Sequence, residues 1–218
     1  MKEKNLLALK ASEDVSDFEI ANIVSQISMY GIISETVFID SYETLYNTLH
    51  NGKKYDYIYL ATHGCETSWG NISGSLNITW IEFAAMVCHS GVTKPGSIFL
   101  HSCCRGGLNK VAWEMFACCD KIQFICGPRQ SLYPVDIITA FNIFLYNVEV
   151  KRTDPVIAAA KVLNATDIRL VCFDRLETTI GVDYHHHCSL VSSEINAAFE
   201  KINEKVIPEG LKAPAISL

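Results

Sequence analysis

A histidine and a pair of cysteines follow two apolar runs of this chain and could form a nucleophilic site. His63 follows the run YIYLAT, and Cys103 and Cys104 follow the run SIFLHS. The thiolate is the nucleophilic form of cysteine, and a nearby imidazole can accept the thiol proton. Taken singly, each residue has a plainer interpretation, because a cysteine after a buried strand is usually part of the packing. Together they predict attack on a carbonyl carbon.

The elements that must position these residues alternate between short β-branched or aromatic runs and longer helical patterns. This alternation predicts an α/β fold with a mainly parallel sheet. Reactive groups gather at the carboxyl ends of strands in such sheets. We expect the strands at 57–62 and 97–102 to be neighbours, with His63 and Cys103 at one edge. The expected strands are 6–11, 36–40, 57–62, 97–102, 123–126 and 168–173, and the expected helices are 17–27, 42–50, 79–88, 108–118, 134–146 and 155–163.

Local signals add detail to this pattern. Ser16 is expected to cap the first helix, and Gly31 to close it. The glycine-punctuated segment 70–79 predicts a hairpin. The pattern weakens after Asp174, where a loop is expected to contain the run HHHC, and an amphipathic helix is expected over 193–206. We therefore expect a single domain over 1–218, with its core at 6–173 and a C-terminal loop and helix at 174–218.

Glycines beside the candidate residues fit acyl-transfer chemistry. Gly64 lets a main-chain N–H approach a substrate carbonyl, and the N–H of Cys103 could supply a second donor for the oxyanion. Gly106 and Gly107 are expected to permit a tight turn from strand to helix.

Composition excludes several other classes of function. The net charge of −6, without any cluster of Lys or Arg, argues against nucleic-acid binding. No segment approaches the roughly 18 consecutive apolar residues that a membrane span needs, and the N-terminus is no secretory signal. Nine cysteines without an export signal are expected to be reduced thiols. We expect a cytosolic protein without membrane or nucleic-acid partners.

No cofactor or metal site is predicted. The adjacent residues of His185-His186-His187-Cys188 cannot all converge on one ion from a regular element, and no second ligand cluster has zinc spacing. The segment GNISGS at 70–75 lacks the strand-before, helix-after context of a phosphate-binding loop.

The two blocks YIYLATHG at 57–64 and IFLHSCCRGG at 98–107 resemble the caspase-like cysteine peptidases, which include caspases, metacaspases, legumain, separases and bacterial CHAT domains. The blocks at 124–147 and 154–164 are similar to CHAT domains in particular. The resemblance covers about 6–173. It implies a three-layer caspase-like fold with about six strands flanked by helices. It also implies an endopeptidase in which His63 assists Cys103, with Gly64 and Cys103 as oxyanion donors.

The doubled cysteine leaves two registers open within this resemblance. Aligning Cys-Arg-Gly with caspases makes Cys104 the nucleophile, whereas the small-Cys-x-x-Gly form makes it Cys103. Cys103 is preferred because it keeps Ser102 in the small-residue position. The residue two before the nucleophile often shapes the pocket for the residue that precedes the cut. With Cys103 as nucleophile, that residue is His101.

The resemblance also implies substrate-binding residues and partners. Ser131, Leu132 and Tyr133 would line the substrate cleft, and Asp136 would favour a basic side chain, although an acidic residue is equally favoured by the helix dipole. The substrate would be a protein or peptide, within a regulated bacterial defence-type system that has a separate regulatory protein. The alternative is a catalytically silent scaffold that binds a partner protein. A hydrolase-type esterase lacks the required elbow motif.

Overall fold

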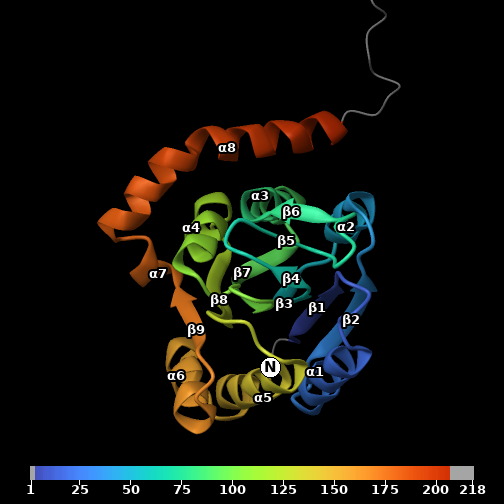
Figure 1. Cartoon of the computed structure of the whole chain (residues 1–218), viewed down its shortest axis with the longest axis vertical. Coiled ribbons are helices and arrows are strands. Elements are labelled where there is room, and N and C mark those ends of the chain that lie inside the picture. Colours follow the sequence, from blue (N-terminus) through green and yellow to red (C-terminus); the bar gives the residue numbers. More distant parts are fainter. Residues whose placement is uncertain (1–2, 207–218) are drawn as a thin grey trace, which may run out of the picture.

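A six-stranded, mostly parallel sheet lies at the centre of the computed structural model, which describes residues 3–206 (Figure 1). The strand order is β2-β1-β3-β7-β8-β9, and every neighbouring pair is parallel except β8 with β9. The strands are β1 (Asn5–Lys10), β2 (Ile33–Phe38), β3 (Tyr55–Ala61), β7 (Thr93–Ser102), β8 (Ile122–Pro128) and β9 (Leu170–Asp174). The predicted α/β class with a mainly parallel sheet is confirmed.

Helices cover both faces of the sheet, which gives three layers (Figure 1). One face carries α1 (Asp17–Met29), α5 (Pro134–Leu145) and α6 (Pro155–Thr166), with the π-helical turn η1 (Tyr146–Val150) after α5. The other carries α2 (Tyr42–Leu49), α3 (Trp80–Ser90), α4 (Asn109–Cys118) and the long α8 (Val182–Val206), which lies across α3 and α4. The short α7 (Arg175–Thr178) joins β9 to α8.

The apolar runs of β3 and β7 explain why these strands occupy the middle of the sheet. Side chains alternate between the two faces of a strand, and a strand covered on both faces must be apolar throughout. In β3, Ile58 and Leu60 pack on the α3 and α4 side, while Tyr57 and Tyr59 pack on the α1 and α5 side. β3 ends at the apolar Ala61, whereas β7 continues past its apolar run to the buried polar residues His101 and Ser102.

β3 and β7 are direct neighbours, as the sequence predicted. Their register pairs Leu60 with His101 and Ala61 with Ser102, and the Thr62 N–H donates to the Ser102 carbonyl at 3.2 Å. The residues after each strand therefore leave the sheet at the same edge.

Several local predictions are confirmed around this frame. The Ser16 side chain accepts the N–H of Phe18 at the start of α1, and Gly31 follows the end of that helix with φ of 74°. The expected hairpin is present as β5 (Ser68–Gly70) and β6 (Asn77–Thr79), and β4 (His63–Gly64) adds a third antiparallel strand.

The expected loop around the HHHC run is wrong, because α8 already begins at Val182 and contains it. Tertiary packing accounts for the difference. The ring of His187 lies 5.4 Å from the ring of Trp113 on α4, and its Nε2 lies 3.5 Å from a carboxylate oxygen of Glu114. These contacts hold a helical turn that the polar sequence does not signal. Residues 207–218 of the predicted C-terminal segment lie outside the described part of the chain.

Candidate active site

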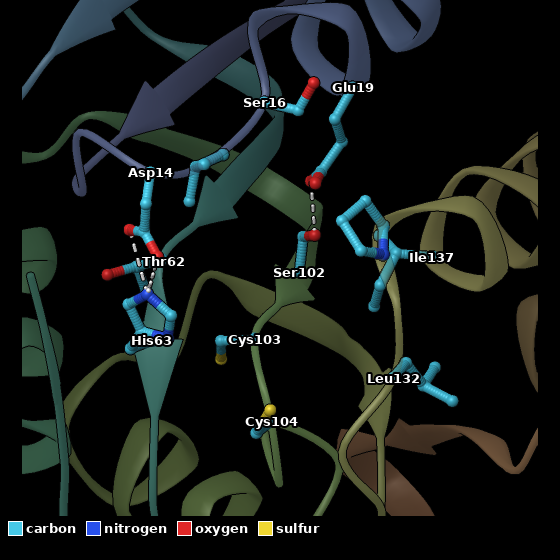
Figure 2. A pocket seen from close by; sticks show the side chains of 12 residues that line it. Asp14, Ser16, Glu19, Thr62, His63, Ser102, Cys103, Cys104, Leu132 and Ile137 are labelled. Atoms are coloured by element: carbon cyan, nitrogen blue, oxygen red, sulfur yellow. Dashed lines mark hydrogen bonds and ion pairs between the residues drawn. The ribbon is translucent and has the colours of Figure 1, made fainter. Parts of the chain in front are cut away.

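A cavity of about 230 Å³ opens at the carboxyl ends of β3 and β7, on the sheet face that carries α1 and α5. We call it the carboxyl-edge cavity. Figure 2 shows the Asp14–His63 pair on one side of it and the Glu19–Ser102 pair on the other, with the two cysteines near its middle. Its lining residues are Asp14, Val15, Ser16, Glu19, Thr62, His63, Ser102, Cys103, Cys104, Leu132, Pro134 and Ile137.

His63 is held by a carboxylate that the sequence analysis did not single out. Asp14, in the loop between β1 and α1, accepts from Nε2 of His63 at 2.8 Å and 3.0 Å through its two oxygens. A hydrogen bond from Ser12 to Asp14, together with His63 itself, lowers the pKa of Asp14, so this side chain is ionised at neutral pH. An acceptor at Nε2 fixes the proton there and leaves the lone pair on Nδ1. His63 is thereby oriented as a base.

Cys103 lies almost completely inside the protein. The residue is 3% exposed and belongs to the apolar cluster on the α3 and α4 side of the sheet. A Cβ atom at either Gly64 or Gly106 would lie 2.9 Å from its Sγ, so the thiol occupies a narrow slot between two glycines. Burial, and to a lesser degree the neighbouring Cys104, raises the pKa of the Cys103 thiol. This sulfur is therefore shielded from a substrate and held as a thiol.

Cys104 differs from its neighbour in exposure. It is half-buried and also lines the carboxyl-edge cavity. The backbone turns just after it, since Arg105 has φ of 62° and the Gly106 N–H donates to the Cys103 carbonyl at 3.2 Å. The Arg105 guanidinium pairs with Glu66 at 2.7 Å, which ties this turn to the β4–β5 hairpin. No hydrogen bond joins His63 to either thiol within residues 3–206.

The turn after the cysteines does not use its glycines as the sequence analysis expected. The positive φ falls on Arg105 and not on Gly106 or Gly107. A Cβ atom at Gly107 would lie 2.1 Å from the carbonyl oxygen of Gly127 on β8. The requirement for glycine here is the close approach of two backbones and not the conformation of the turn.

The backbone N–H of Gly64 faces away from the small antiparallel sheet. The Cys65 N–H donates to the Ser68 carbonyl at 2.9 Å, so Cys65 and Ser68 form a hydrogen-bonded pair. Pairs alternate along an antiparallel ladder, which makes Gly64 and Trp69 a non-hydrogen-bonded pair. A Cβ atom at Gly64 would also lie 2.9 Å from the Cys104 carbonyl oxygen. Only glycine fits here, and its N–H is left for another acceptor.

Glu19 of α1 forms a second polar part of the cavity that the sequence analysis missed. The residue is 5% exposed, and its Oε1 accepts hydrogen bonds from Ser102 Oγ at 2.5 Å and Tyr59 OH at 2.7 Å. Burial raises the pKa of Glu19 despite these two donors. A signal was present in the sequence: an acidic residue in the first turn of a helix that begins at the same edge of the sheet as His63.

Among the predicted substrate-binding residues, only Leu132 lines the cavity, together with its neighbours Pro134 and Ile137. Ser131 and Tyr133 are exposed and Asp136 is half-buried, and none of the three lines it.

The cavity also does not contain His101. This side chain is fully buried on the opposite face of β7, with its ring 4.9 Å from that of Trp80 and its Nδ1 3.1 Å from the Gly106 carbonyl. Burial lowers the pKa of His101 to about 4, so it is a neutral packing residue. Ser102, one position later, occupies the cavity instead.

A third thiol near the site is more acidic than the predicted one. Cys65 is exposed, and its Sγ lies 3.5 Å from the hydroxyl oxygens of Thr67 and Ser68. Slight burial raises the pKa of Cys65, but these hydroxyl contacts outweigh it and lower the pKa to about 7. Cys65 is therefore the thiol of this region that an added electrophile would alkylate most readily.

Within residues 3–206, no group of three or more His, Cys, Asp or Glu side chains is arranged to hold a metal ion. None of the helices in this range is both long and apolar enough to cross a bilayer. No protein-family model matches the chain, and neither does any curated protein sequence.

Proposed function

We propose that the protein is a cytosolic cysteine endopeptidase of the caspase-like type. The observation that carries the proposal is the convergence of His63, oriented by Asp14, with two cysteine residues at one cavity. These groups come from the carboxyl ends of adjacent parallel strands, which is where active sites of open α/β sheets form. The resemblance of the sequence blocks at 57–64 and 98–107 to caspase-like peptidases supports the same reaction.

Two observations favour Cys104 as the nucleophile over Cys103, which the sequence favoured. A nucleophile must reach a substrate carbonyl, and Cys103 is 3% exposed while Cys104 is half-buried. In addition, the residue two before the nucleophile is expected to shape the pocket for the substrate side chain. With Cys104 as nucleophile, that residue is Ser102, which lines the cavity, whereas Cys103 would make it the fully buried His101.

The proposed reaction has two halves. His63 Nδ1 takes the thiol proton of Cys104, and the sulfur attacks the carbonyl carbon of the peptide bond. The N–H groups of Gly64 and Cys104 would stabilise the oxyanion. The imidazolium then gives its proton to the leaving amine, which departs as the acyl-enzyme forms. Water loses a proton to His63 and attacks the thioester, which releases the carboxylic acid and restores the thiol.

An electrophilic peptide probe and a peptide-cleavage assay would test this proposal together. All variants should carry Cys65→Ser, because the Cys65 thiol, with its pKa lowered to about 7, would otherwise dominate labelling. Cys104→Ala and His63→Ala are expected to abolish cleavage, while Cys103→Ser is expected to retain it. If Cys104→Ala retains cleavage and Cys103→Ser loses it, Cys103 is the nucleophile. A parent protein that cleaves no peptide of a diverse library would overturn the proposal.

A scaffold without activity is the second candidate, and one observation favours it. Neither thiol of the pair is hydrogen-bonded to His63 within residues 3–206, and burial raises the pKa of Cys103 above its usual range. Such a protein would bind a partner without cleaving it. Binding of the same partner by the parent and by Cys104→Ala, with no cleavage by either, would support the scaffold.

Regulation of the proposed peptidase activity is supported by the sequence resemblance alone. CHAT-like proteins act in regulated systems, including bacterial defence, so we propose a separate regulatory protein for this chain. The cleavage assay should therefore be repeated with candidate proteins encoded beside it.

A further inference from the structure

Glu19 offers one unoccupied carboxylate oxygen to the carboxyl-edge cavity. Both hydroxyl donors, Ser102 Oγ and Tyr59 OH, bind the same oxygen, Oε1. Among residues 3–206, no hydrogen bond to Oε2 is formed. Because the side chain lines the cavity while the residue is 5% exposed, Oε2 is the oxygen left to face it.

No positive charge in the described part of the chain balances this carboxylate. Glu19 takes part in none of the ion pairs formed by the side chains of residues 3–204. Lys10, at the end of β1, pairs with Asp17, and Arg105, in the turn after the cysteines, pairs with Glu66. A buried carboxylate without a counter-charge is unfavourable, and protein interiors normally pair or neutralise such groups. A cationic group on a ligand would supply the counter-charge that this carboxylate lacks.

The walls of the cavity define the shape of that ligand. Val15, Leu132 and Ile137 contribute apolar surface to the lining of the cavity. An aliphatic stem with a cationic end matches this arrangement, and Lys and Arg side chains have that form. At about 230 Å³, the cavity is smaller than the roughly 300–1,000 Å³ of pockets for drug-sized ligands, and it suits a single side chain.

We propose that Glu19 selects a Lys or Arg side chain of the substrate at the position that precedes the cut. This inference rests on the proposed endopeptidase activity and names its substrate class. Ser102 connects the two sites, because its hydroxyl holds Glu19 while its carbonyl accepts from Thr62, the residue before His63. Selection of the positive charge is thereby assigned to Glu19 on α1. Asp136, for which the sequence resemblance implied this role, does not line the cavity.

The first experiment needs no mutation. Peptides that differ only at the residue before the cut, with Arg, citrulline, Lys or norleucine there, are compared by kcat/KM. Citrulline has the shape of Arg without its charge, so an electrostatic role for Glu19 predicts a preference for Arg of about 10- to 100-fold. Equal cleavage of the Arg and citrulline peptides would overturn the inference while leaving the endopeptidase proposal intact.

The second experiment assigns the preference to one residue. Glu19→Gln keeps an oxygen that can accept from Ser102 and Tyr59, so the fold is expected to survive. The Arg-over-citrulline ratio should fall to near one in this variant. Glu13→Gln removes the same charge from an exposed position in the loop before α1 and should leave the ratio unchanged. A ratio that persists in Glu19→Gln would assign the selection elsewhere and overturn the inference.

A binding measurement separates this inference from the activity on which it rests. Cys104→Ala is titrated with an uncleaved peptide that carries Arg or citrulline at the same position. Arg-peptide affinity that exceeds citrulline-peptide affinity, and loses this advantage with Glu19→Gln, would support the cation site even if no cleavage is found. Equal affinities for the two peptides would contradict it.

Discussion

Two buried glutamates lie on the same face of the sheet, yet their surroundings are opposite. Tyr57 and Tyr59 are two residues apart on β3, and each donates its hydroxyl to one of them. Glu149 of η1, which accepts from Tyr57, also pairs with Lys4 at 2.7 Å and Arg152 at 3.4 Å. Glu19, which accepts from Tyr59, pairs with no cation in the described part of the chain.

The difference separates a structural ion cluster from a binding site. Glu149 has its counter-charges within the chain, and its cluster joins the amino end of β1 to η1. Glu19 lines the same cavity as His63 and the cysteines, and one of its carboxylate oxygens faces that cavity. Four predictions test this contrast.

Replacing His63 with Ala should affect activity far more than stability. Loss of a general base lowers rates by about 10²- to 10⁴-fold, which we expect in kcat/KM for peptide cleavage. The His63 side chain is 50% exposed, so the free energy of unfolding should change by less than about 0.5 kcal/mol. Urea denaturation beside the cleavage assay measures both. A large loss of stability would make His63 part of the framework.

Glu149→Ala should show the reverse pattern. It leaves the buried Tyr57 hydroxyl without its acceptor, which destabilises the fold by about 1–3 kcal/mol in urea denaturation. Lys4 and Arg152 are partly exposed and can turn to water, which limits the loss. Glu149→Gln, which keeps an acceptor for Tyr57, is the matched control and should lose less. Cleavage by folded Glu149→Ala should match the parent, and a selective loss of activity would break the contrast.

Glu19→Gln should leave stability unchanged or raise it slightly at neutral pH. Burial raises the pKa of folded Glu19 above its ordinary value of 4.5, so the unfolded chain releases this proton first as pH rises. The Glu19 contribution to the free energy of unfolding therefore falls from about pH 4.5 upward, until the folded carboxyl has also ionised. The difference between parent and variant, measured by urea denaturation across this range, isolates Glu19. A parent that gains stability relative to the variant with rising pH would contradict the assignment.

Asp14→Asn should have only a small effect on activity. The Asp14 side chain is 40% exposed, and partly exposed ion pairs contribute about 0–1 kcal/mol, so kcat should fall by no more than about 5-fold. Asp17→Asn removes an equal charge from a residue that pairs with Lys10 and should leave kcat unchanged. A loss as large as that of His63→Ala would show that Asp14 is as necessary as the base itself.

Much of the frame of the site could be predicted from the sequence because it depends on local patterns. Apolar runs of strand length and capped amphipathic segments placed β3 and β7 side by side, and His63 and the cysteines at their ends. The register of the cysteine pair could not be predicted in this way. A shift of one residue moves a side chain to the other face of the sheet, and only packing decides which face holds the slot between Gly64 and Gly106.

Local sequence patterns could not predict the hydrogen-bond partners of these residues, for a different reason. Asp14 is 49 residues from His63, and Glu19 is 83 residues from Ser102, so no spacing rule relates them. Likewise the HHHC run carries no helical signal of its own and is helical where α8 packs on α4.

Hydrophobic periodicity is a local property, so the sequence was enough to predict the α/β class and the edge at which the histidine and cysteines meet. Three features needed the folded structure: which thiol is accessible, the pairing of Asp14 with His63, and the lack of a cation for Glu19 among the described residues. Burial and charge balance depend on segments far apart in the chain, and they become defined only when the helices close over the sheet.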